Sequence, residues 1–399
     1  MLNTNRIINS LLDNDLYTFS VCYAYLQKFP RAIGKYTFVD RNHTAYTGEF
    51  AKILAEQFKL YEDIRFTEEE VNFLESKCDY FPKWFFTFLR GFHLDSSEVD
   101  VKFGDDGLSI TVTGPLWRTV FWEMPILATV SELSHIRRGD MVNYDKCKEY
   151  NKIYKKGLYL IENNIFFSDF GTRRRFSFDH QDLVIRALIE AQNDSKKKCF
   201  VGTSNVYFAM KYGLKPIGTM SHQFIEACSE FGYNEANYVA MDYWQDVYKG
   251  DLGIFLYDTY TRPVFFRNFT LLHAKLFDGL RVDSGDNIEA LEEIIQKYEA
   301  LGIDPSTKTI VFSNGLNPEE AVEIHKKVNG RMKDSYGIGT NLTCDIDNVK
   351  PMNIVVKLTG IKITEKREWK NTVKLSDDYG KYTGNPDEIE IAKKTLNIK

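Results

Sequence analysis

The chain has 399 residues, of which 43% are hydrophobic, so it holds enough apolar material for a large core and for two domains. Its net charge of -5 argues against nucleic acid as a main partner. We find no apolar run of about 18 residues, and the first residues lack the basic and apolar segments of a secretory signal. Neither a membrane span nor secretion is therefore expected.

The cysteines and histidines are scattered through the chain. The 6 cysteines form no CxxC pair, and the 7 histidines show no HxxxH spacing. Neither a zinc site nor a disulfide framework is expected from such a pattern. Isolated cysteines of this kind are typical of reduced packing residues in a cytoplasmic protein.

The first 140 residues predict an α+β domain. Apolar residues at helical spacing indicate helices in this part of the chain, and a run rich in β-formers indicates a strand. Two further strands flank Gly104-Asp105-Asp106-Gly107, which is typical of a hairpin turn. The expected helices span 13–29, 51–61 and 123–136, and the expected strands 36–39, 99–103 and 108–113.

Strand and helix patterns alternate over residues 141–360. We count eight candidate strands with helices between most of them, which is the number found in a (β/α) barrel. An apolar, β-prone run at 158–167 leads into the turn that begins at Ser168. We expect residues 361–399 to pack back on the N-terminal domain. The expected strands span 165–167, 199–202, 216–218, 252–256, 279–282, 309–312, 335–338 and 353–358, and the expected helices 181–192, 205–212, 221–231, 270–276, 288–301 and 318–330.

The turn after the first barrel strand carries an aromatic residue and three arginines. It reads SDFGTRRRFSFDH over 168–180, between the strand and the next helix. Arg173, Arg174 and Arg175 offer forked donors that suit carboxylate or phosphate, and Phe170 offers a face for stacking. A solvated basic loop is the alternative. Ligands in α/β proteins bind at this kind of turn.

Polar and glycine residues also follow the later barrel strands. Any one of these groups could be a plain turn, a packed histidine or a helix-capping carboxylate. Together they fall at the strand end that carries active sites in barrels. They predict a site for several anionic groups, with a carboxylate pair suited to magnesium in Asp283 and Asp286. The other residues are Thr203 and Ser204 after the second strand, His222 after the third, Arg281 at the fifth, Asn314 and Gly315 after the sixth, and Gly337, Gly339 and Thr340 after the seventh.

Eight ordered motifs resemble the bacterial nicotinate phosphoribosyltransferases, which are type II phosphoribosyltransferases. They are NDLYTFSVCYAYLQKFP, DFGTRRR, FVGTSN, GTMSHQF, LRVDSGD, FSNGLN, GIGTNLT and KLSDDYGKYTG, and they run over nearly the whole chain. The resemblance implies an irregular α/β barrel beside an N-terminal α+β domain, and a homodimer with shared active sites. It also implies transfer of phosphoribose from phosphoribosyl pyrophosphate to nicotinate in NAD salvage, assisted by ATP and magnesium.

The same resemblance implies roles for single residues. His222 occupies the position of a phosphohistidine, and Arg281 and Asp283 complete the catalytic set. From helical spacing alone, and not from the resemblance, Glu226 lies one helical turn after His222, where we expect it to hold the imidazole. Phe170 and a Tyr17 from the neighbouring subunit would stack on the pyridine. Arg173 or Arg174, with Arg281, would hold carboxylate or phosphates, and Asp283 the ribose hydroxyls or magnesium. Gly315, Gly337, Gly339 and Thr340 would cradle the 5-phosphate, and Lys374 and Lys381 would lie near the pyrophosphate.

Ser204 favours nicotinate over nicotinamide. Nicotinamide-using relatives carry a carboxylate at this position, which accepts the amide N–H and would repel nicotinate, whereas a serine can donate. Nicotinamide or quinolinate as the acceptor, a catalytically silent nucleotide-binding relative and an unrelated sugar-phosphate hydrolase stay open as alternatives.

Overall fold

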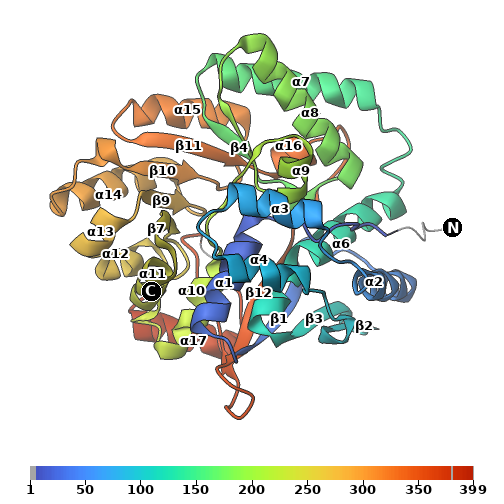
Figure 1. Ribbon diagram of the computed structural model, residues 1–399, viewed down its shortest axis with the longest axis horizontal. Coiled ribbons are helices and arrows are strands. Elements are labelled where there is room, and N and C mark those ends of the chain that lie inside the picture. The colour runs from blue at the N-terminus through green and yellow to red at the C-terminus, as the bar shows by residue number, and fades with distance from the viewer. Residues whose placement is uncertain (1–5, 379–380, 399) are drawn as a thin grey trace.

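The computed structural model describes residues 6–378 and 381–398, and in this part of the chain the strands form two sheets (Figure 1). One sheet is antiparallel, in the order β13-β12-β1-β3-β2. The other has seven parallel strands, in the order β6-β5-β4-β11-β10-β9-β8. In Figure 1 helices α12 to α15 lie along the left side of the parallel sheet, helices α7 and α8 lie at its top, and the antiparallel strands lie at the lower right. The predicted combination of an irregular α/β barrel with an N-terminal α+β domain is confirmed.

The antiparallel sheet contains the predicted hairpin. Strands β2 and β3 pair down to Gly104 and Gly107, where the chain turns. Gly107 has a φ of 87°, a left-handed conformation that glycine adopts without strain. The strands are β1 (Ile33–Asp40), β2 (Val99–Gly104), β3 (Gly107–Pro115), β12 (Ile354–Lys362) and β13 (Lys370–Asn371).

The parallel sheet is built from short strands, most of which start within two residues of their predicted positions. Two of them, β9 and β10, have the predicted bounds. All neighbours in the sheet run parallel, so their carboxyl ends lie at one edge. The strands are β4 (Phe167–Asp169), β5 (Phe200–Thr203), β6 (Lys215–Pro216), β8 (Ile254–Leu256), β9 (Gly279–Val282), β10 (Thr309–Phe312) and β11 (Lys333–Ile338), and β7 (Lys249–Leu252) lies just before β8.

One predicted barrel strand is wrong, and the β-prone run before the first strand is mostly helical. The segment 353–358 begins β12, which pairs antiparallel with β1 from Asp40↔Ile354 to Ile33↔Lys362 and so belongs to the other sheet. The run at 158–167 begins as the end of helix α7 (Lys146–Glu162), passes through a short turn, and reaches β4 only at Phe167. A short apolar run fits a buried helix end as well as a strand, and periodicity alone does not separate the two.

Capping residues define many helix starts. Thr67 and Glu70 form a capping box at α3, and Asn317 and Glu320 form another at α15. Within the described residues, no helix has the length and apolar character needed to span a bilayer. The helices are α1 (Leu16–Lys28), α2 (Gly48–Tyr61), α3 (Glu68–Lys77), α4 (Lys83–Arg90), α5 (Leu116–Thr119), α6 (Glu123–Arg138), α7, α8 (Phe178–Ser195), α9 (Val206–Lys211), α10 (His222–Cys228), α11 (Ala236–Tyr248), α12 (Arg262–Asn268), α13 (Leu271–Leu276), α14 (Asn287–Ala300), α15 (Pro318–Val328), α16 (Thr340–Thr343) and α17 (Pro386–Leu396).

A buried ion pair ties the N-terminal segment to the parallel sheet. Arg175, after β4, donates from Nη1 and Nη2 to the two carboxylate oxygens of Asp13, at 2.6 and 2.7 Å. Both side chains are almost completely buried. The last of the three consecutive arginines therefore holds the two parts of the molecule together and is withheld from ligands.

Candidate active site

Three cavities meet at the carboxyl edge of the parallel sheet, and Arg173 and Asp283 line all three. We call them the phenylalanine cavity, about 140 Å³ and lined by Phe170; the lysine cavity, about 370 Å³ and lined by Lys374; and the histidine cavity, about 30 Å³ and lined by His222. Because they share two side chains, they form one continuous site.

The phenylalanine cavity brings together residues from four strand ends. Phe170 lies against Gly337, where an added Cβ would come within 2.4 Å of the ring. The guanidinium of Arg281 lies 5.8 Å from the centre of the same ring. A glycine is therefore needed behind the ring, and the cavity offers an aromatic surface beside a cation. Gly315, Gly339 and Thr340 also line it, as the sequence predicted.

The two arginines before Arg175 point in different directions. Arg173 Nη1 lies 3.9 Å from Glu123, and about a third of the Arg173 side chain is exposed. Arg174 donates from Nε to the carbonyl of Ile354 at 3.1 Å. Arg174 lines the phenylalanine and lysine cavities, whereas Arg173 also reaches the histidine cavity. Arg173 has the weaker contacts within the protein and is the freer of the two to bind a ligand.

The lysine cavity is strongly basic. Lys374 and Lys381 line it, together with Asn314, whose side chain donates to the carbonyl of Gly285 at 2.8 Å. Two further cations, Arg41 and Lys357, line the cavity and were not predicted from the sequence. Burial, together with the positive charge of Lys374, lowers the pKa of Lys357 to about 8. Lys357 interrupts the apolar run IVVKLTG, and this lone charge in a buried strand was the signal available.

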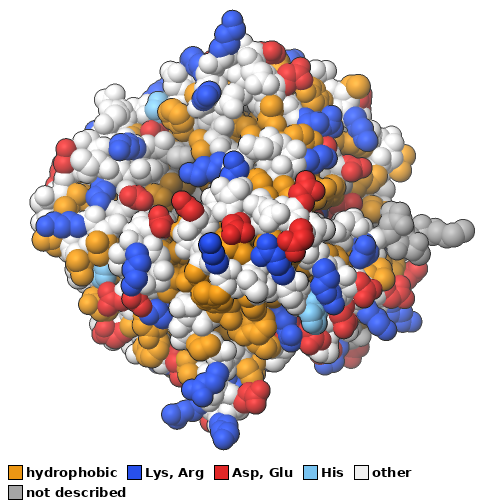
Figure 2. Space-filling view, in the orientation of Figure 1, with side chains coloured by type: hydrophobic (Ala, Val, Ile, Leu, Met, Phe, Trp, Pro, Cys, Tyr) orange, Lys and Arg blue, Asp and Glu red, His pale blue; other side chains and the backbone are white. Residues whose placement is uncertain are grey.

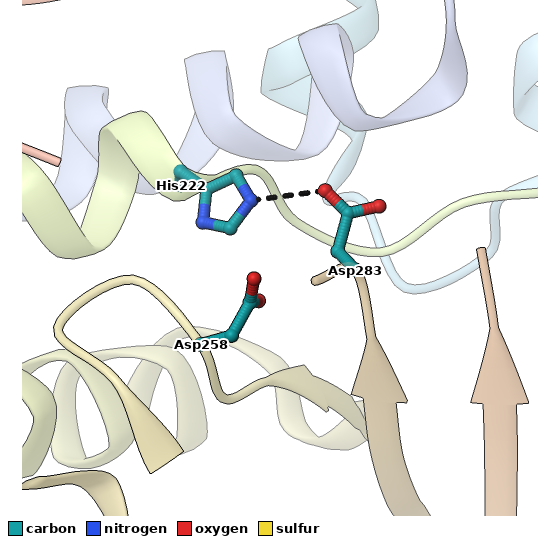
Figure 3. Close-up of side chains that lie close together, drawn as sticks. All are labelled: His222, Asp258 and Asp283. Carbon is teal, nitrogen blue, oxygen red and sulfur yellow. Dashed lines mark hydrogen bonds and ion pairs between the residues drawn. The ribbon is translucent and has the colours of Figure 1, made fainter. Parts of the chain in front are cut away.

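His222 and Asp283 form the centre of the site (Figure 3). His222 Nε2 lies 3.1 Å from Asp283 Oδ2, and His222 Nδ1 lies 2.9 Å from the hydroxyl of Thr259. Burial lowers the pKa of His222 well below its usual value, and the positive charge of Lys374 adds to this. The ring is therefore neutral at pH 7.

The expected contact between His222 and Glu226 is absent among the described residues. Glu226 is fully buried, and neither of its carboxylate oxygens has a hydrogen-bond partner in the described part of the chain. It lines the histidine cavity beside Lys357, and burial raises its pKa to about 7. The ring partners of His222 are Thr259 and Asp283, and the predicted role of Glu226 is wrong.

Asp283 is held as an anion. Its Oδ1 accepts from Arg281 Nη2 at 3.2 Å and from the Ser313 hydroxyl at 2.7 Å. Burial by itself would raise its pKa, but the charge of Arg281 and the contact with His222 outweigh that effect and hold the pKa well below its usual range. This carboxylate can accept from ribose hydroxyls or bind a cation.

The predicted magnesium pair needs correction. The exposed Asp286 caps helix α14, where its Oδ1 accepts from the backbone N–H groups of Ile288 and Glu289. Asp258 takes its place near Asp283, because ligand atoms of His222, Asp258 and Asp283 lie within 4.8 Å of one another (Figure 3). Asp258 is fully buried, and its Oδ1 has no hydrogen-bond partner among the described residues. Two carboxylates of this kind fit a magnesium ion that also binds substrate phosphates.

Three other predicted residues differ from expectation. Thr203 and Ser204 are buried, and their hydroxyls donate to Asp169 and Asp15, each at 2.8 Å. Neither lines one of the three cavities, so direct substrate binding by them is not supported. We expected Tyr17 to reach a neighbouring subunit, but it lines the histidine cavity of its own chain, and its hydroxyl donates to Glu123 at 2.9 Å.

Comparisons with known proteins agree over nearly the whole chain. Residues 165–399 match the nicotinate phosphoribosyltransferase family model, and residues 12–131 match the model of the N-terminal domain of the same family. Nicotinate phosphoribosyltransferases from Desulforapulum autotrophicum and Chromohalobacter salexigens are 40% and 41% identical, each covering 98% of this chain and 99% of the relative. The crystal structure of nicotinate phosphoribosyltransferase from Porphyromonas gingivalis is 44% identical and superposes with a TM-score of 0.94, covering 98% of this chain and 100% of that one.

Proposed function

The chain belongs to the nicotinate phosphoribosyltransferase family, and we propose that its three joined cavities transfer phosphoribose from phosphoribosyl pyrophosphate to nicotinate. The products are nicotinate mononucleotide and pyrophosphate, and the reaction belongs to NAD salvage. One observation carries the assignment of the site. An aromatic surface, a glycine-rich turn and a cluster of cations all converge on Asp283.

Each part of the two substrates has a matching part of the site. The pyridine would lie against Phe170, with its carboxylate held by Arg173 and Arg281. The 5-phosphate would bind the turn of Gly337, Gly339 and Thr340, where backbone amides are available. The pyrophosphate would extend into the lysine cavity. This arrangement leaves the ribose between the phenylalanine and lysine cavities, beside Asp283, which lines both.

The chemistry requires positioning and charge stabilisation and no strong base. The ring nitrogen of nicotinate is already a nucleophile, and the ribose carbon gains positive character as pyrophosphate leaves. Catalysis then depends on holding the two in line and on neutralising the leaving group. The anionic Asp283 suits the positive sugar, and Lys357, Lys374 and Lys381 suit the pyrophosphate.

We further propose that ATP phosphorylates His222 and that magnesium assists both steps. Asp258 and Asp283 would hold the ion, which supplies positive charge to the phosphates when bound. His222 lines the histidine cavity together with Asp283, and its ring is neutral. A neutral imidazole has a nitrogen lone pair, which supports a role for His222 as the phosphate acceptor.

We also propose a cytoplasmic homodimer. The 6 cysteines are unpaired, which fits a reducing compartment. Trp84 on α4 is 45% exposed, and Figure 2 shows hydrophobic side chains gathered on and below this helix. An exposed apolar face of this kind fits contact with a second copy. Light scattering of the purified chain and of Trp84→Glu should give a dimer and a weakened dimer; a monomeric wild type would contradict this proposal.

The function is tested by incubating the protein with phosphoribosyl pyrophosphate, magnesium and one pyridine at a time, with and without ATP. Nicotinate should give its mononucleotide and pyrophosphate, and ATP should raise the yield. Faster conversion of nicotinamide or quinolinate would change the assigned acceptor. Release of free sugar or inorganic phosphate without any pyridine product would point to a hydrolase.

A further inference from the structure

Three lysines on one face of helix α7 contact the segment that follows the glycine-rich turn after β11. Lys148, Lys152 and Lys156 are spaced four residues apart, which places their side chains on the same face of the helix. The exposed fractions of the three side chains fall in that order, at 56%, 27% and 15%. Lys156 is therefore the most buried of the three.

The ammonium group of Lys156 has three oxygen partners, and two of them belong to Asn341. Its Nζ donates to the backbone carbonyl of Asn341 at 2.5 Å, to Oδ1 of the same residue at 2.8 Å and to Asp345 Oδ2 at 2.7 Å. An ammonium group carries three N–H donors, so each donor has an acceptor here. Lys156 thus holds both the backbone and the side chain of Asn341.

Asn341 belongs to the active site. It lines the phenylalanine cavity together with Gly337, Gly339 and Thr340, the residues of the turn whose backbone amides would bind the 5-phosphate. Lys156 itself lines none of the three cavities, so its contact with the site runs through Asn341.

The other two lysines contact residues further along the chain. Lys152 donates to the carbonyl of Asp345 at 2.6 Å and to Asp347 Oδ1 at 3.3 Å, and Lys148 donates to Asp347 Oδ2 at 2.7 Å. Lys152 Nζ also lies 3.1 Å from Asp345 Oδ2. The same helix face therefore offers three like side chains, of which Lys156 is the one bonded to a residue that lines the site.

We propose that Lys156 is a positioning residue that holds the glycine-rich turn in the shape that binds the 5-phosphate of phosphoribosyl pyrophosphate. The proposal rests on the assignment of that turn to the 5-phosphate in the proposed function. Backbone amides bind a phosphate well when several of them point to one place, so a turn that is free to rearrange pays for ordering on binding and loses affinity. Asp345 balances the charge of Lys156, so its contribution lies in fixing Asn341 and not in net charge.

Lys156→Met tests this role, because it keeps most of the apolar stem and removes the three donors. Asp345 keeps Lys152 as a partner, so the fold should be kept. Calorimetry measures the Kd of ribose 5-phosphate, which would occupy the turn, and of pyrophosphate, which would occupy the lysine cavity. The variant should bind ribose 5-phosphate roughly tenfold more weakly, the low end of what a hydrogen bond to a charged group contributes. Its Kd for pyrophosphate should stay that of the wild type.

Lys152→Met and Lys148→Met are the matched controls, since they make the same change one and two helical turns earlier. Both should bind ribose 5-phosphate as the wild type does, and thermal unfolding compares the stability of all three variants. If Lys156→Met is unstable, the uncharged and shorter Lys156→Gln replaces it with the same expectation.

Three outcomes would overturn the inference. An unchanged Kd for ribose 5-phosphate in Lys156→Met would show that Asn341 keeps its place without the lysine. Equal weakening of pyrophosphate binding, or equal weakening in Lys152→Met, would show a general loosening of the fold. If the wild type binds pyrophosphate but no ribose 5-phosphate, the proposed role of the turn itself fails, and this inference fails with it.

Discussion

His222 Nε2 lies 3.1 Å from Asp283 Oδ2, although the two residues are 61 positions apart in the sequence. This contact joins the proposed phosphate acceptor to the carboxylate that faces all three cavities. The two proposed steps, use of ATP and transfer of phosphoribose, therefore meet at one pair of side chains. The two steps can nevertheless be separated by substitution.

His222→Asn should abolish ATP hydrolysis and acid-labile labelling from γ-labelled ATP. A slow, ATP-independent transfer of phosphoribose should remain, because Phe170, Arg281 and the phosphate-binding groups are untouched. Product formation with and without ATP checks both parts. Label that persists in the variant would move the acceptor to another residue.

Arg281→Ala should weaken transition-state binding by about 2–5 kcal/mol, the cost of removing one member of a buried charge pair. Its guanidinium lies beside both Asp283 and the Phe170 ring, so its loss affects the anion and the stacking surface together. The measurement is kcat/KM for nicotinate, with Arg281→Lys as the variant that keeps the charge. Turnover close to that of the wild type in soluble Arg281→Ala would remove this arginine from the site.

Gly337→Ala should displace the Phe170 ring, because the added Cβ would lie 2.4 Å from it. We expect a higher KM for nicotinate and a stability loss of about 1–3 kcal/mol from overpacking. The matched control is Gly104→Ala in the hairpin, where an added Cβ meets nothing within 4 Å. Equal behaviour of the two variants would show that the ring has room to move.

Neighbouring arginines should respond differently to the same change. Arg175→Met leaves Asp13 buried without its partner, which should cost about 3–5 kcal/mol of stability. Arg174 lines two cavities. Arg174→Met should therefore weaken binding of phosphoribosyl pyrophosphate while leaving the stability of the protein nearly unchanged. Urea unfolding together with a binding assay tests the contrast. The assignment fails if Arg174→Met is the less stable variant.

Glu226 should make the free energy of unfolding depend on pH. Burial raises its pKa from 4.5 to about 7 in the folded protein, so the folded state binds this proton more tightly than the unfolded state. This contribution to stability is complete below pH 4.5 and is lost as the pH rises through 7. Glu226→Gln should remove it and be the more stable form at pH 8, by an amount on the order of 2 kcal/mol. Denaturant unfolding at pH 5 and pH 8 measures the free energy of unfolding of both proteins. The same change between the two pH values in wild type and in Glu226→Gln would contradict the prediction.

Local sequence patterns determined the class of fold and the edge where the site lies. Strands such as β9 and β10 were predicted with their observed bounds, because a short apolar segment bounded by turn residues is a local signal. The carboxyl ends of parallel strands lie together, so the residues that follow them could be assigned to one site. Phe170, Arg281 and Gly337 were found in this way.

The tertiary structure decided which side chains complete the site and which do not. The residue pattern of strand β12 would be the same in a barrel and in an antiparallel sheet, so its pairing with β1 could not be predicted from that pattern. For the same reason, the position of Lys357 on this strand at the site could not be predicted. The course of the backbone in each turn decides that Asp286 caps helix α14 and that Asp258 lies close to Asp283. Alternation and spacing are properties of one segment, whereas partners and side-chain directions depend on the segments packed against it, and only the folded chain specifies those.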